Sequence, residues 1–310
     1  MATTDLIPEV NLTVPSKGMR RFGERVVHVA LFLCASISIL TTIGIVVVLL
    51  LEAIQFFLDV SVIEFLTDSK WTPLMDPQHF GIAPLFCGTL LVAFGSAVVA
   101  IPVGLGTAIC LSEYAKPWFR EIMKPVLEVL AGIPSVVYGY FAIVFISPWV
   151  RTIFPSAGVF NALNACIVVG VMTMPMVISL SEDALRAVPR SLREGAYALG
   201  ATKYDVTTQV VVPAAMSGIV ASFLLAISRA IGETMAVTLA AGGTPNATIN
   251  PLESIQTMTA YIVAVSKGDT PAGTLEYRTI FAVGLTLFIS TMLMNLLAQW
   301  VLSRVREKYE

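Results

Sequence analysis

The chain has 310 residues, of which 56% are hydrophobic and only 13% charged, and its mean hydropathy is +0.82. Soluble domains carry about 25% charged residues, so the 19 basic and 21 acidic side chains could not cover a core this apolar. A net charge of −2 gives no reason to expect nucleic-acid binding. His28 and His79 are too far apart in sequence to suggest a metal site. Composition therefore predicts an integral membrane protein.

Six apolar segments are long enough to cross a bilayer, which takes about 20 helical residues. They are 26–58, 85–111, 126–146, 162–180, 211–241 and 280–302. Their breaks show no strand alternation, so we expect an all-α polytopic bundle and not a barrel. The first and fifth segments exceed about 30 residues and must tilt, kink or project beyond the lipid. The membrane domain would cover 26–305, between a flexible N-terminal tail, 1–25, and a short C-terminus, 306–310.

The basic residues predict the orientation. With a cytoplasmic N-terminus, 14 of the 19 Lys and Arg residues lie on the cytoplasmic side, four lie outside, and Arg229 lies within a span. The positive-inside rule therefore places both termini in the cytoplasm. Lys124 also lies on this side, four residues before Glu128, a spacing that suits an interfacial ion pair.

The cytoplasmic loop 181–210 is rich in signals for helix ends. Pro189 can open a helix, Ser191 and Glu194 have the spacing of a capping box, and Gly200 can end the helix in the left-handed conformation. Thr202-Lys-Tyr-Asp205 offers a second, weaker box. The pattern predicts two short helices that meet at Gly200. The first could insert into a groove of another protein or rest on the membrane surface, and the local pattern alone does not separate these readings.

The same loop resembles the EAA loop of ABC importer permeases in every spacing. The matching residues are Glu194, Gly195, Ala196, Gly200 and Pro213. The departures are mild: Gly195 stands for an alanine, and Val210 and Val212 stand for isoleucine and leucine. The resemblance implies a coupling helix that seats in an ATP-binding subunit. The chain has no Gly-Lys dipeptide and hence no Walker A loop, so we expect ATP hydrolysis in a separate subunit, and no catalytic residue, cofactor or metal here.

The fifth segment places Arg229 and Glu233 inside the membrane, where charged side chains are costly. Spacing of i, i+4 on one helix would let them pair, and Gly232 between them would let another backbone approach. Two interpretations stay open. The pair either locks two helices together or lines the pathway of an anion, because a guanidinium fork suits phosphate-type oxyanions.

A narrower resemblance concerns the permeases of the high-affinity phosphate importer. Arg229-Ala-Ile-Gly232-Glu233-Thr is similar to their Arg-Ala-x-Gly-Glu-Thr signature, and Ala131-Gly-Ile-Pro134-Ser resembles a further segment. The stretch around Trp71 looks like PstC more than its partner PstA. Over about residues 65–300, this resemblance implies that Arg229 and Glu233 are critical for transport. The helix-breaking residues Pro102, Gly132, Pro134 and Gly232 are expected to be packing features first, and they could serve as hinges.

We therefore expect a MetI-like permease bundle in the bacterial inner membrane that translocates phosphate by alternating access. The expected partners are a PstA-like second permease subunit, a PstB-like ATPase dimer, a PstS-like extracytoplasmic binding protein and the lipid bilayer. The alternatives are a PstA-like subunit, a permease for another oxyanion such as molybdate or sulfate, and an anion channel or secondary transporter. Internal repeats typical of a secondary transporter are not detected.

Overall fold

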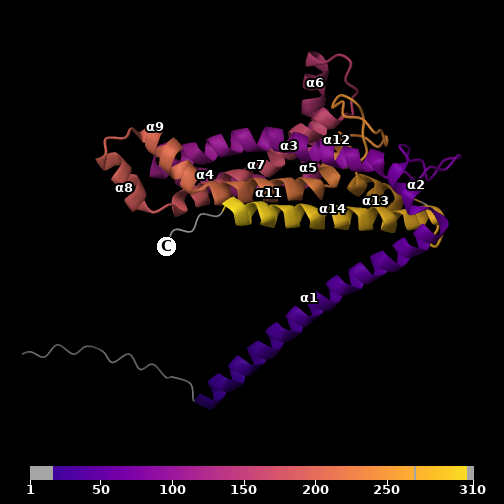
Figure 1. Ribbon diagram of the computed structural model, residues 1–310, viewed down its shortest axis with the longest axis horizontal. Coiled ribbons are helices and arrows are strands. Elements are labelled where there is room, and N and C mark those ends of the chain that lie inside the picture. Colours follow the sequence, from indigo (N-terminus) through magenta and orange to yellow (C-terminus); the bar gives the residue numbers. More distant parts are fainter. Residues whose placement is uncertain (1–16, 269, 306–310) are drawn as a thin grey trace, which may run out of the picture. The chain divides into compact units, whose positions relative to one another are not determined.

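The computed structural model describes residues 17–268 and 270–305, and in this part of the chain the regular structure is helical (Figure 1). Five of these helices are long and apolar enough to span a membrane, and a bent pair makes a sixth candidate. The prediction of an all-α polytopic protein is therefore confirmed. Residues 1–16 of the predicted N-terminal tail and the predicted C-terminus, 306–310, lie outside the described residues.

The chain divides into two compact units, residues 1–51 and 52–310. Helix α1 (Lys17–Asp59) passes from the first unit into the second. It begins at Lys17, so the predicted tail 1–25 is too long by nine residues that are helical. Among the described residues of the first unit α1 has no helix to pack on, and its apolar side chains, such as Phe32 and Leu40, are exposed. A surface of this kind suits contact with lipid or with another membrane subunit.

The second unit is built around long helices that run side by side (Figure 1): α3 (Ala83–Ile109), α7 (Ala162–Ala187), α11 (Met216–Ile231) and α14 (Leu275–Val305). Small residues let α3 and α7 approach closely. A Cβ atom added at Gly95 would lie 2.3 Å from Cys166 Sγ, and one added at Gly170 would lie 2.7 Å from Val99 Cβ. Such glycine contacts are typical of membrane helix pairs, which gain stability from close packing.

The predicted span 126–146 is not one helix. Helix α4 (Pro117–Gly132) ends before Ile133 and Pro134, both of which have extended backbone angles, and α5 (Ser135–Phe141) starts after them. Proline cannot donate the helical hydrogen bond and pushes the residue before it out of the helical region. The candidate span instead runs over Ser135–Ile153, through the π-helical turn η2 (Ala142–Ile146) and α6 (Ser147–Ile153).

The predicted span 211–241 is also broken. The helical segment that enters it starts earlier, at Lys203, and comprises α9 (Lys203–Asp205), the π-helical turn η3 (Val206–Val211) and α10 (Val212–Ala214). This segment meets α11 at an angle of 67°. Pro213 lies beside this bend, and proline and π-helical turns are common causes of such kinks. A second break separates α11 from α12 (Met235–Ala240). The other predicted spans fall within α1, α14, α7 and the continuous segment Ala83–Tyr114 formed by α3 and η1 (Cys110–Tyr114).

An aromatic cluster closes one end of the second unit, near α2 (Val62–Thr67) and α13 (Met258–Ser266). Trp71 packs edge-on against Tyr261, with ring centroids 5.0 Å apart, and also against Phe65. Trp71 pairs with Phe80 through an isolated antiparallel bridge, and His79 Nδ1 lies 2.9 Å from the Asp68 carboxylate. These contacts hold the loop between α2 and α3 in one shape. The short helices α8 (Arg190–Ala198) and α9 lie at the opposite end of the bundle (Figure 1).

Candidate functional site

The loop 181–210 folds largely as its turn signals predict. Helix α8 begins at Arg190, directly after Pro189, and Gly200 adopts the left-handed conformation with φ +86°. The Thr202–Asp205 capping box is present. The box predicted at Ser191 is wrong, because α8 has already started at Arg190 and Ser191 lies inside it, where it cannot act as the N-cap.

One face of α8 is free within this chain. Glu194 and Gly195 are exposed, and Leu199, directly after the helix, is 90% exposed. A Cβ atom added at Gly195 or Gly200 would meet open space. Ala196 is half-buried and packs on the cluster below, while Pro213 is exposed in the next helical segment. Glu194, Gly195 and Gly200 therefore lie on a short exposed helix and its C-terminal turn, a shape that fits a groove on another protein, whereas Pro213 lies apart in α10.

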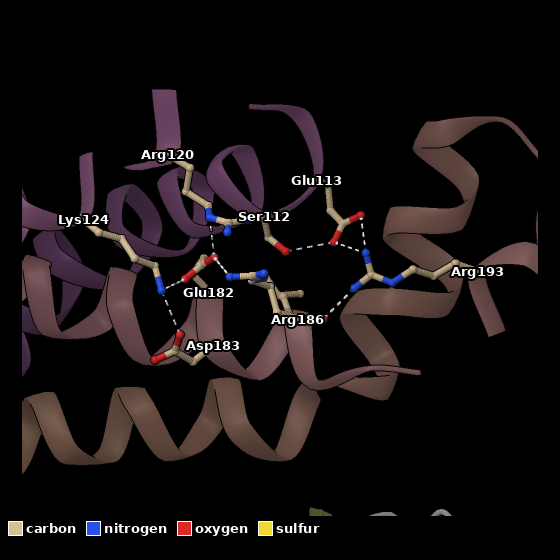
Figure 2. A network of polar contacts seen from close by, with 9 residues as sticks. Ser112, Glu113, Arg120, Lys124, Glu182, Asp183, Arg186 and Arg193 are labelled. Carbon is tan, nitrogen blue, oxygen red and sulfur yellow. Dashed lines mark hydrogen bonds and ion pairs between the residues drawn. The ribbon is translucent and has the colours of Figure 1, made fainter. Parts of the chain in front are cut away.

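Arg193 is the charged residue of α8 that turns toward the bundle. Its Nη1 atom donates to both carboxylate oxygens of Glu113, at 2.9 and 3.0 Å, and its Nη2 atom donates to the Leu185 carbonyl at 2.7 Å (Figure 2). The Glu113 side chain is only 6% exposed and lies in η1. Ser112 Oγ donates a further hydrogen bond to Glu113 at 2.9 Å. The guanidinium thus joins three elements, α8, η1 and the end of α7.

A second buried carboxylate, Glu182 of α7, lies beside this pair (Figure 2). Its side chain is 2% exposed and forms ion pairs with Lys124 at 2.8 Å, Arg120 at 3.6 Å and Arg186 at 3.7 Å. Lys124 also contacts Asp183 at 3.2 Å. The short contact with Glu182 raises the pKa of Lys124, against burial, which lowers it. Lys124 therefore pairs with carboxylates of α7. The ion pair with Glu128 predicted from the i, i+4 spacing does not form among the described residues.

Arg229 and Glu233 do not form the predicted pair in the described part of the chain. Helix α11 ends at Ile231, Gly232 is its C-cap, and the i, i+4 geometry ends with it. The Glu233 carboxylate instead accepts a hydrogen bond from the Ala236 N–H at 3.2 Å, at the start of α12. Glu233 is thus a helix-capping side chain at the break, and Arg229 is left exposed with no ion pair to any described residue.

Arg229 instead lines a cavity of about 390 Å³ between α4, α7 and α11. Its polar lining includes Lys124, Glu128, Glu182 and Asp183, and Leu111 of η1 forms part of its wall. Two of these carboxylates are already balanced by cations of the buried cluster, whereas Arg229 is not. The cavity therefore presents one free guanidinium to whatever enters it. No group of His, Cys, Asp and Glu in the described residues is placed to hold a metal ion.

Three of the four predicted hinge or packing residues lie at helix breaks. Gly132 ends α4, Pro134 precedes α5, and Gly232 ends α11. Pro102 lies inside α3, which stays continuous around it. Their role as hinges stays a prediction, but these positions are where a change of helix direction is already built in.

The sequence interpretation missed the two buried carboxylates and their cations. Glu113 and Arg193 are separated by 80 positions, and Arg120 and Lys124 lie on a different helix from Glu182, so no local spacing links these pairs. Arg186 is the exception, because it lies four residues after Glu182 on α7. A signal was available, because Glu113 and Glu182 each follow directly on an apolar segment. Ionisable residues at such depths are costly unless paired.

These features together define a class of protein. A bundle with broken spans and an exposed short helix between two of them is the arrangement expected of the transmembrane component of an ABC importer. Residues 100–307 match the family described as "Binding-protein-dependent transport system inner membrane component", and the chain belongs to that family. It is the non-catalytic permease component and a multi-pass protein of the inner membrane.

Several curated proteins are similar over most of their length. The "Probable ABC transporter permease protein YqgH" of Bacillus subtilis is 36% identical over 94% of each chain. The "Phosphate transport system permease protein PstC" of Mesorhizobium japonicum is 30% identical over 93% of each chain. PstC of Haemophilus influenzae is 32% identical over 78% of this chain and 82% of its own.

Solved ABC transporters share the fold. A bacterial alginate ABC transporter in complex with its periplasmic protein superimposes with a TM-score of 0.64 at 15% identity, over 94% of this chain and 99% of that chain. The inward-facing MetNI methionine ABC transporter gives a TM-score of 0.56 at 18% identity, over 71% of this chain and 94% of that chain. At these identities the similarity shows the fold, and the predicted importer-permease architecture is confirmed.

Proposed function

We propose that the chain is a PstC-type subunit that carries inorganic phosphate inward across the membrane. The observation that carries the proposal is Arg229, which has no ion pair to any described residue and lines a mainly apolar cavity beside a helix break. Curated relatives named as phosphate permeases, similar over most of the chain, support phosphate as the anion. The match of Arg229-Ala-Ile-Gly-Glu233-Thr to the signature of that group supports it further.

The cavity has the charge balance that transport requires. A guanidinium offers a planar fork of donors that matches oxyanions, but a site that binds too tightly would retain its substrate. Glu128 in the same lining lowers the net attraction, whereas Glu182 and Asp183 are paired with cations of the buried cluster. Arg229 would then compensate the phosphate charge for the time of its passage. Glu233 would affect phosphate passage indirectly. Its hydrogen bond from the Ala236 N–H stabilises the start of α12 and therefore the helix break that follows Arg229.

The exposed surfaces support the proposed partners. The free face of α8 would seat in a PstB-like ATPase dimer, whose closure would drive alternating access. The apolar face of α4 and α5, with Val129 70% and Tyr140 65% exposed, would contact a PstA-like second permease subunit. A PstS-like binding protein would deliver phosphate at the end that carries α2 and α13. Both chain termini would then lie in the cytoplasm.

Uptake of labelled phosphate into vesicles that contain the whole complex tests the substrate. We expect ATP-dependent, binding-protein-dependent uptake of phosphate that excess unlabelled phosphate suppresses and equal sulfate or molybdate does not. Suppression by sulfate or molybdate alone would replace phosphate by that oxyanion. Uptake without ATP or an ATPase subunit would favour a channel or a secondary transporter.

The orientation predicts which surface lysines are accessible from outside. In a background in which the four native cysteines are replaced by serine, Lys267→Cys is expected to react with a membrane-impermeant maleimide in intact cells. Lys116→Cys is expected to react only after permeabilisation. Both lysines are exposed, so the pair is matched. The opposite labelling pattern would invert the topology and remove α8 from the ATPase side.

A further inference from the structure

Helix α8 is attached to the rest of the chain through few side chains. None of its residues is buried, and only Arg193 and Ala196 are half-buried. Ala196 makes apolar contacts with the cluster beneath it, which also contains Leu185 and Val206. Apolar contacts are non-directional and allow a short helix to slide or rotate. A helix that is to transmit a displacement needs a contact that fixes both distance and direction.

The Arg193–Glu113 contact has these properties. Both carboxylate oxygens accept from the guanidinium at 2.9 and 3.0 Å, and a second nitrogen donates to the Leu185 carbonyl. Charge-assisted bonds to both oxygens add geometric specificity as well as strength. The side chains are only 21% and 6% exposed, so water and salt screen the pair much less than a surface pair. Ser112 further orients the carboxylate.

The element that receives this contact leads directly to the cavity. Glu113 lies in η1, which continues α3 without a break, and Leu111 of the same turn lies in the wall of the cavity lined by Arg229. Single π-helical turns within α-helices are frequent at functional sites. A displacement of α8 that is passed to Glu113 therefore acts on the cavity wall two residues away.

We propose that Arg193 is a positioning residue that couples the movement of α8 to η1, and through η1 to the wall of the anion cavity. This inference rests on the proposed function of α8 as the ATPase contact and adds the route by which that contact reaches the site. Arg193 touches neither substrate nor nucleotide in this scheme. It converts a displacement of α8 into a displacement of η1 because Nη1 is held by Glu113 while Nη2 of the same rigid guanidinium is held by the Leu185 carbonyl.

The test uses the complete complex in vesicles, with the ATPase, the second permease subunit and the binding protein. Arg193→Lys keeps the charge but loses the fork, Arg193→Gln loses both, and Glu113→Gln weakens the acceptor. We expect each variant complex to assemble and hydrolyse ATP, while labelled phosphate taken up per ATP hydrolysed falls about tenfold. The double variant Arg193→Glu with Glu113→Arg, which exchanges the two charges, is expected to recover part of the phosphate uptake per ATP hydrolysed. Lys116→Gln, which removes an exposed cation at the same end of the bundle, is expected to leave it unchanged.

Wild-type uptake per ATP in assembled Arg193→Lys and Arg193→Gln complexes would overturn the inference. Failure of all Arg193 and Glu113 variants to assemble would also overturn it, since the pair would then be an anchor only. If phosphate is not the transported anion, the wild-type complex will take up no phosphate, and this result is distinguishable from a loss of coupling. In that case the coupling is read from the stimulation of ATP hydrolysis by the binding protein, which Arg193→Lys is expected to reduce by about the same factor.

Discussion

Replacement of Arg229 by glutamine is expected to reduce ATP-dependent phosphate uptake by about 10- to 100-fold, the loss that corresponds to hydrogen bonds with a charged partner. Glutamine keeps much of the side chain's length and polarity but removes the charge and the fork. Since Arg229 has no ion pair to any described residue, its removal leaves no buried carboxylate without a partner. The complex should therefore still assemble, and uptake should be lost at the transport step. Labelled-phosphate uptake and co-purification of the ATPase measure the two effects.

Two further variants sharpen this result. Arg229→Lys keeps the charge without the fork and is expected to be intermediate. Glu233→Gln keeps an oxygen that can accept from Ala236 and is expected to have a smaller effect than Arg229→Gln. Normal uptake by an assembled Arg229→Gln complex would contradict the pathway proposal. Loss of assembly in that variant would show that Arg229 has a structural role, the other interpretation that its position in an apolar segment allows.

Glu182→Gln is expected to destabilise the permease by about 3 kcal/mol, the low end of the cost of removing one partner from a buried ion pair. Three cations, Arg120, Lys124 and Arg186, face this carboxylate, and its side chain is 2% exposed. The loss leaves them to repel one another between α4 and α7. We expect the low end of this free-energy range because the side chains of the three cations are 25–46% exposed and can turn toward water.

The melting midpoint of the purified complex measures this effect. With an unfolding entropy of about 2.1 cal/mol/K per residue, a change of about 3 kcal/mol in a chain of 310 residues corresponds to a decrease of about 5 °C. Asp183→Asn is the matched control, because Asp183 is adjacent, contacts the same Lys124 and is 60% exposed. Exposed ion pairs contribute about 0–1 kcal/mol, so the control should shift the midpoint by less than about 2 °C. Equal shifts for the two variants would contradict the buried-cluster explanation.

Lys124 is expected to keep its charge and its ion pair with Glu182 at physiological pH. The pKa of Lys124 is raised in the folded protein, so its contribution to stability is fully present below the ordinary value of 10.5 and is lost only as the pH rises through the raised folded value. Lys124 is therefore charged throughout the neutral range. Lys124 therefore acts as a constant connection between α4 and α7 over this range.

Local chemistry explains why the coupling loop could be predicted and the charge contacts could not. Pro189 and Gly200 act on the backbone of their own neighbours, so the limits of α8 follow from a few adjacent residues. Arg229 could be singled out as a candidate site residue because a guanidinium in an apolar segment is costly. The predicted ion pair between Arg229 and Glu233 was wrong because i, i+4 pairing assumes an unbroken helix, and α11 ends two residues after Arg229. The true ion pairs join residues that only the packing of α4, α7, α8 and η1 brings together.

The sequence by itself determined the class of the protein, the number of its apolar segments and the place of the exposed helix α8. These properties depend on composition, on the length of apolar runs and on turn residues, all of which act locally. Only the tertiary structure decided where the third and fifth segments break, that Glu233 caps α12 and that Arg229 faces a cavity. It also decided that Arg193 and Lys124 find their carboxylates on other helices. The reason is that a charge in the membrane domain takes the partner that close packing places within about 4 Å, whatever its distance along the chain.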